Sequence, residues 1–178
     1  MQTSSTDLWD VIAEEAARES PLWGESLLPP SERDLDPVFS PLADERYVLG
    51  LETIYEGYLL HYGRPRLFSP RDRDTGLLLG DYLYAHGLVH VAMLDVVDAV
   101  ADLAALISLC AQLRAAGEDG DGAVWAATAS RIGEGALEEA RAALRENGDS
   151  RPLLDLARGT GSADGMERAL AAHRARVG

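Results

Sequence analysis

The 178-residue chain lacks several features that define whole classes of protein. A single cysteine, Cys110, excludes an internal disulfide, and its apolar neighbours predict a small core residue. No uninterrupted run of about 18 apolar residues occurs, so we expect no transmembrane segment. The first residues carry no basic region followed by an apolar one, which argues against a secretory signal. Together these absences predict a cytoplasmic protein.

Lysine is also absent, and 30 acidic residues stand against 16 arginines, which gives a net charge of −14. Binding to duplex DNA or RNA needs a continuous cationic face, so this charge argues against a nucleic-acid partner. Only the segment from Arg64 to Arg73 is locally basic. We interpret it as a solvated loop, and the functional alternative is a loop that approaches an anionic partner surface or a diphosphate.

No complete catalytic or cofactor-binding motif is present. The chain has no Gly-x-Ser-x-Gly nucleophile elbow, and without lysine it cannot form a phosphate-binding P-loop. We therefore expect no catalytic residue and no cofactor held by this chain alone.

Two clusters of polar residues have a spacing that metal ions can use. His86 and His90 are four residues apart, so on a helix both imidazoles point to one side. Gly87 stands where a zinc-protease motif has glutamate, and no further ligand is evident, so we predict a packed histidine pair and keep metal ligation as the less favoured alternative. Asp95, Asp98 and Asp102 resemble a magnesium cluster, but helix capping explains them with fewer assumptions.

Apolar residues recur at helical spacing through most of the chain, and no stretch of five residues alternates as a strand does. With 47% hydrophobic residues, the chain is long enough to bury one core. These patterns predict an all-α, single-domain helical bundle over residues 1–178. Its expected parts are a first helix ending near Ser20, a proline-rich wrapping segment (21–41), central helices (42–116) and shorter C-terminal helices (123–178).

The central helices have the strongest patterns. The first is expected from about Leu42 to His61, where Tyr62-Gly63 ends it. The second begins near Asp74 and is apolar almost all round, which is typical of a central, buried helix. A third is expected to follow a cap at Asp95 and to run to Ala116.

The second central helix carries a family resemblance. Its sequence from Gly76 to Leu88, GLLLGDYLYAHGL, resembles the central helix of trans-polyprenyl diphosphate synthases, in which leucines precede Gly-Asp, an aromatic residue and alanine. In that family a loop with glycine, a basic residue and proline lies upstream, and here Gly63-Arg64-Pro65-Arg66 stands in that place. The likeness covers roughly residues 42–116. It implies a partial isoprenoid-synthase-like fold.

The chain departs from that family where the chemistry occurs. Active synthases hold diphosphate through magnesium bound by two Asp-Asp-x-x-Asp motifs, and this sequence has neither. Without those carboxylates the developing diphosphate charge cannot be met by magnesium. The resemblance therefore implies a noncatalytic or regulatory subunit, similar to the small subunit of heterodimeric polyprenyl synthases, with magnesium bound only by an aspartate-rich catalytic partner.

The resemblance also supplies candidate interface or cavity residues. Under the subunit hypothesis the second central helix lines an elongating-chain cavity or the subunit interface, and the basic loop faces the partner or a diphosphate. The candidates are Arg64, Arg66, Asp81, Tyr82, His86 and Met93. Two alternatives stay open: a stand-alone helical interaction protein, including a homodimer, and a small-molecule or lipid-binding helical protein without catalytic activity.

Overall fold

The computed structural model describes residues 5–159 and 163–177, and every regular element in these ranges is a helix. This confirms the predicted all-α, single-domain bundle. The α-helices are α1 (Ser5–Glu19), α2 (Pro21–Glu25), α3 (Val48–Tyr62), α4 (Arg73–Ala92), α5 (Val97–Ala116), α6 (Asp121–Arg131), α7 (Glu138–Asn147), α8 (Arg151–Arg158) and α9 (Ala163–Val177), and the 3₁₀ turns are η1 (Pro30–Glu32), η2 (Ser40–Leu42) and η3 (Glu45–Tyr47).

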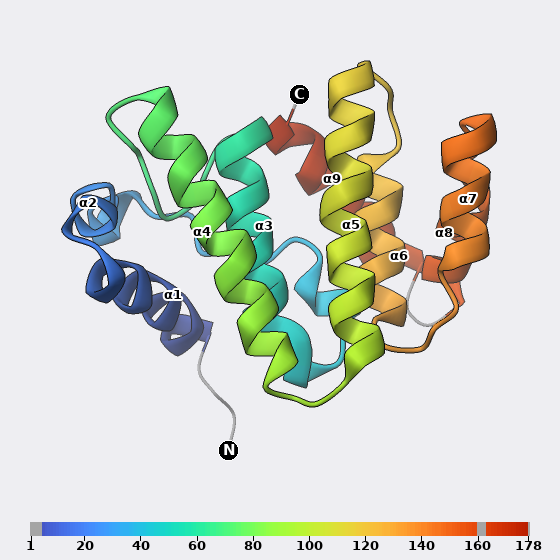
Figure 1. The fold of residues 1–178 in the computed structure, drawn as a ribbon, viewed down its shortest axis with the longest axis horizontal. Coiled ribbons are helices and arrows are strands. Elements are labelled where there is room, and N and C mark those ends of the chain that lie inside the picture. The colour runs from blue at the N-terminus through green and yellow to red at the C-terminus, as the bar shows by residue number, and fades with distance from the viewer. Residues whose placement is uncertain (1–4, 160–162, 178) are drawn as a thin grey trace.

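The helices form an elongated row (Figure 1). Helices α3 and α4 lie side by side at the centre, α1 and α2 cover one end, and α7 and α8 lie at the other. The main core lies between α3, α5, α6, α8 and α9, and it includes Cys110, as the sequence predicted. A smaller second core joins α1 to α3, α4 and the loop between them.

Helices α3 and α4 cross unusually closely because glycines face each other at the contact. A Cβ atom on Gly57 would lie 2.8 Å from the carbonyl oxygen of Gly80. A Cβ atom on Gly87 would lie 2.9 Å from the carbonyl oxygen of Gly50 and 2.5 Å from Cγ1 of Ile54. The small residues therefore set the distance between the two helices, which in turn places the side chains on both.

Three details of the predicted layout were wrong. Helix α3 begins at Val48 rather than Leu42, because the chain before it forms the 3₁₀ turns η2 and η3, which Ala43 and Asp44 separate. The segment 21–41 is not extended throughout, since it opens with the short helix α2. After α2 it pairs with the loop that follows α3: Leu28 N donates to Leu67 O (2.8 Å), and Ser69 N donates to Ser26 O (2.7 Å). Asp95 is not the N-cap of α5: it has a φ of 57°, and Val96 takes the cap position.

Helix α4 is buried on one side only, although its composition predicted burial all round. Leu79, Leu83 and Val91 face the protein interior. Its opposite side is open: Leu78 is 58% exposed and Val89 53% exposed. The sequence pattern could not separate these faces, because both carry apolar residues.

The open side continues into the turn that joins α4 to α5. Met93 is 76% exposed and Val97 80% exposed, and Leu94 lies between them at the surface. Exposed alanines continue from Val89 and Val97 at spacings of three or four residues, which places them on the same side of each helix: Ala85 and Ala92 on α4, and Ala101 and Ala104 on α5. We call the surface formed by Ala85, Val89, Ala92, Met93, Leu94, Val97, Ala101 and Ala104 the α4–α5 face.

One helix among the described residues, α5, is long and apolar enough by length and composition to cross a membrane, although the sequence had predicted none. This is weak support for a membrane span, because the core helix of a folded protein passes the same test. Leu103, Leu106 and Leu109 of α5 belong to the main core, and its Asp102 forms a buried ion pair with Arg141 (3.0 Å).

Candidate functional site

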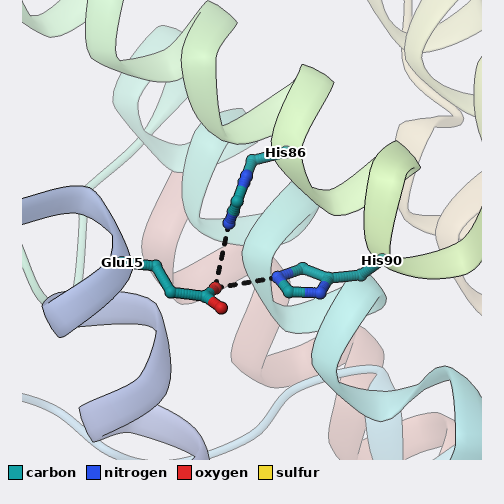
Figure 2. Close-up of side chains that lie close together, drawn as sticks. All are labelled: Glu15, His86 and His90. Atoms are coloured by element: carbon teal, nitrogen blue, oxygen red, sulfur yellow. Dashed lines mark hydrogen bonds and ion pairs between the residues drawn. The ribbon is translucent and has the colours of Figure 1, made fainter. Parts of the chain in front are cut away.

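His86 and His90 lie together, and the structure adds a third residue that the sequence did not indicate. The carboxylate oxygen Oε2 of Glu15 lies 2.9 Å from Nε2 of His86 and 2.9 Å from Nε2 of His90 (Figure 2). The three ligand atoms all lie within 4.8 Å of one another. They come from two helices, Glu15 from α1 and both histidines from α4.

Packing fixes both helices of this cluster. The four-residue spacing puts both imidazoles on the side of α4 that faces α1. Helix α1 is held against α4 by the second core, where its inward side chains pack with those of the loop and α4. The members of this core are Trp9, Ile12, Ala16, Leu67, Phe68, Leu79 and Leu83.

Aromatic stacking also orients His86. The ring of Tyr82 lies nearly parallel to the imidazole of His86, with a centroid separation of 5.2 Å and an interplanar angle of 17°. Trp23 stacks on Tyr82 in turn, at 6.1 Å. Tyr82 is thus a neighbour of the Glu15–His86–His90 cluster.

The Glu15 carboxylate is ionised and partly open to solvent. Burial alone raises its pKa, but the hydrogen bonds and charges of His86 and His90 outweigh burial and lower it below the ordinary value. Side-chain exposure is 25% for Glu15, 28% for His86 and 16% for His90. The cluster can therefore act as a hydrogen-bonded contact between α1 and α4, or as a set of three ligands for a cation.

The basic loop is exposed at Arg64, Arg71 and Arg73, as the sequence predicted, but Arg66 is fully buried. Its guanidinium pairs with Glu52 through Nη1 (2.8 Å) and with Glu56 through Nε (3.1 Å), both from α3. It also lies over the rings of Trp9 and Tyr55. Arg66 therefore cannot meet a diphosphate or a partner, since its charge is already compensated inside the protein.

The other predicted interface or cavity residues are dispersed. Arg64 is exposed and donates a hydrogen bond to the carbonyl of Ala175 in α9. Asp81 is exposed, with Oδ1 3.1 Å from Nε2 of His61. Met93 belongs to the α4–α5 face, so it lines no cavity. Two of the six candidates, Tyr82 and His86, stack on each other.

The aspartates considered as a magnesium cluster do not converge on one point. Asp95 and Asp98 are exposed. Asp102 is buried, where its carboxylate pairs with Arg141 and accepts a hydrogen bond from Gly133 N (2.8 Å). Asp102 therefore ties α5 to the segment after α6 and has no free oxygen directed toward its two neighbours.

A second polar cluster, which the sequence did not indicate, joins four helices. Asp121 of α6 accepts hydrogen bonds from Tyr58 of α3 and Arg114 of α5, and lies 3.2 Å from Nε2 of His173 in α9. The other nitrogen of His173 lies 3.0 Å from the hydroxyl of Tyr55. An open cleft of about 500 Å³ lies beside the cluster. The polar groups of the cluster bind one another, so we interpret the cluster as a structural contact that holds the four helices together.

Acidification is expected to reduce the stability that the Asp121 cluster contributes. Burial raises the pKa of Asp121, but hydrogen bonds from His173 and Tyr58 and the charges of His173 and Arg114 lower it well below 3.8. Because the folded chain binds this proton less tightly than the unfolded chain, the stabilisation is complete above the ordinary carboxyl pKa and is lost as the pH falls through the folded value. Asp121→Asn should cost about 2 kcal/mol of unfolding free energy at pH 7.

Urea unfolding of the wild type and the variant from pH 7 to pH 2 measures this effect, and the difference between the two curves should shrink as the pH falls. Asp119→Asn is the matched control: it removes the same charge two residues away at an exposed position. Its cost should stay within about 0.5 kcal/mol. Equal losses in both variants would show that Asp121 has no special role.

Neither Glu15 nor Asp121 could have been selected from the sequence. Each is one of 30 acidic residues, and each has a histidine partner on a helix distant in the chain: His86 lies 71 residues from Glu15, and His173 lies 52 from Asp121. No local spacing signals such contacts.

Comparison with known proteins identifies no relative: the chain matches no family model, no curated protein and no solved structure. The class that the fold and the site define is thus an all-α protein with a Glu-His-His cluster and an open apolar surface. The resemblance to trans-polyprenyl diphosphate synthases stays a prediction from the sequence.

Proposed function

We propose that this chain is a noncatalytic subunit whose α4–α5 face binds another protein chain. The main support is that four large apolar side chains are exposed within nine residues of sequence: Val89, Met93, Leu94 and Val97. Single exposed apolar residues are ordinary, but a contiguous apolar surface marks a site of association. Association buries this surface and stabilises the complex through the hydrophobic effect.

Charge favours a partner of a different kind over a second copy. The chain carries a net charge of −14, and exposed Asp81, Asp95 and Asp98 lie beside the α4–α5 face. In a symmetric dimer across this face, two acidic rims would meet, and like charges at an interface oppose association. A partner with a basic rim would instead be attracted, so the homodimer is the less favoured alternative.

The sequence resemblance specifies the partner as the aspartate-rich catalytic subunit of a polyprenyl diphosphate synthase. The structure is compatible with a chain that lacks this chemistry itself. In α3, Glu52 and Glu56 form buried ion pairs with Arg66, so neither carboxylate is open to a magnesium ion. Magnesium and diphosphate would then be held by the partner.

Reconstituting the reaction tests this function. Prenyl transfer from an allylic diphosphate to isopentenyl diphosphate would be measured for this chain, for a candidate aspartate-rich subunit from the same cells, and for the mixture. We expect no product from this chain alone and a marked gain in the mixture. Product formation by this chain alone, or no binding to any such subunit, would refute the proposal.

Charges placed on the α4–α5 face should abolish the complex. Val89→Asp combined with Met93→Asp buries two carboxylates in an apolar interface, which should weaken binding at least about a hundredfold, because uncompensated buried charges cost several kcal/mol. Ala115→Asp, at an exposed position near the other end of α5, is the control and should bind like the wild type. Calorimetric titration with the partner measures both, and undiminished binding by the double variant would exclude this face.

A further inference from the structure

We propose that Glu15, His86 and His90 form a binding site for a divalent transition-metal ion, with Zn²⁺ as the ion that this donor set fits best. The site is independent of the proposed function, because the three residues lie between α1 and α4 and outside the α4–α5 face.

The geometry is close to that of a liganded site. Zinc bonds to histidine nitrogen and carboxylate oxygen at about 2.0–2.2 Å, so tetrahedral ligand atoms lie about 3.3 Å apart. Here Oε2 of Glu15 lies 2.9 Å from each Nε2, and all three atoms lie within 4.8 Å of one another. The two contacts of Glu15 would need to lengthen by about 0.4 Å, with the imidazole nitrogens brought to the same spacing, to admit an ion between the three atoms.

The charge of the cluster also suits a cation. Among the described residues the only ion-pair partners of the Glu15 carboxylate are His86 and His90, so no arginine competes for it. Imidazoles bind a metal in their neutral form, so with the Glu15 carboxylate the donor set would carry one negative charge, which a divalent ion more than compensates. Partial exposure leaves access for the ion and room for water as a fourth ligand, as in zinc sites with an open position.

The donor types select the class of metal. Imidazole nitrogens suit zinc and its transition-metal neighbours, whereas Mg²⁺ and Ca²⁺ prefer oxygen ligands. Stacking of Tyr82 on His86 holds one imidazole in place, as surrounding residues do in metal sites. The metal would link α1 to α4 and so add to the apolar contacts of the second core.

Zinc titration of the untagged, metal-stripped full chain tests the site. Glu15→Gln retains an oxygen that accepts a hydrogen bond but removes the charged ligand, and His90→Gln is a second, independent variant. Glu14→Gln is the matched control, because it removes the same charge from the adjacent, exposed position of α1. Circular dichroism establishes that each variant keeps its helices, and if one variant fails to fold the other still decides the question.

We expect one Zn²⁺ per chain in the wild type and in Glu14→Gln, with binding at least about tenfold weaker in Glu15→Gln and His90→Gln. Saturating zinc should raise the melting temperature of the first two proteins only, and Mg²⁺ should have no such effect. Zinc binding should also weaken on acidification, since protons compete for the ligands. Absence of stoichiometric binding by the wild type, or equal binding by all variants, would overturn the proposal.

Discussion

Replacing Arg66 by alanine is expected to lower the free energy of unfolding by about 4 kcal/mol. The Arg66 guanidinium is fully buried, and so are the carboxylates of Glu52 and Glu56 that it pairs with. Burial lowers the pKa of Arg66, but the two carboxylates outweigh burial and raise it, so the guanidinium stays charged. Removing it leaves two buried acidic groups four residues apart on α3 without a counter-charge.

The loss extends beyond the ion pairs. The backbone amides of Arg66 and Leu67 each donate to Oε1 of Glu56 at 2.8 Å, so Glu56 also holds the loop in place. The Arg66 guanidinium lies 4.5 Å from the ring centroid of Trp9 in α1. The Arg66 side chain thus joins α1 and α3 to the loop between α3 and α4.

Urea unfolding monitored by circular dichroism measures the effect. Arg66→Lys keeps a charge but loses the planar fork that contacts two carboxylates, so we expect an intermediate loss of about 2 kcal/mol. Arg64→Ala, in the same loop but exposed, should cost no more than about 1 kcal/mol. If Arg66→Ala were as mild as Arg64→Ala, the buried ion-pair network would not stabilise this fold.

Replacing Gly87 by leucine is expected to lower the free energy of unfolding by at least about 3 kcal/mol. Even the first added carbon would lie 2.9 Å from the backbone oxygen of Gly50, which cannot rotate away as a side chain can. Helices α3 and α4 would have to separate. Gly87→Ala should be milder, at about 1 kcal/mol, because the better helix propensity of alanine offsets part of the clash.

Gly24→Ala is the control for this series. Its added carbon would lie 3.5 Å from Cβ of Ala17, which is ordinary contact, so the substitution should be neutral or stabilising by up to about 1 kcal/mol. Chemical unfolding of the three variants gives the comparison. A neutral Gly87→Leu would show that the α3–α4 crossing is not set by close packing.

The sequence predicted the helices well where capping and periodicity act locally. The ends of α1 and α5 follow from such signals, with Pro21 after Glu19 and Gly117 in the left-handed conformation after Ala116. The start of α3 was missed because the two 3₁₀ turns before it, η2 and η3, are short helical turns that sequence spacing does not separate from the first turn of an α-helix. The open side of α4 was missed because apolar residues on a helix do not reveal which of them another element covers.

The site was predictable only in part. The spacing of His86 and His90 placed them on one side of a helix, which the structure confirms. Glu15 could not be added, because its position depends on how α1 packs on α4. Arg66 was wrongly predicted as solvated because its partners lie upstream on α3, and a charged residue gives no local sign that it is buried.

Methionine oxidation shows directly whether a protein partner covers the α4–α5 face, as we propose. Met93 is 76% exposed, whereas Met166 is 1% exposed and serves as an internal reference. Oxidation follows exposure, so Met93 should oxidise much faster than Met166 in the chain alone. In a saturated complex with the aspartate-rich subunit, Met93 should slow toward the rate of Met166, and an unchanged rate for Met93 would contradict the account.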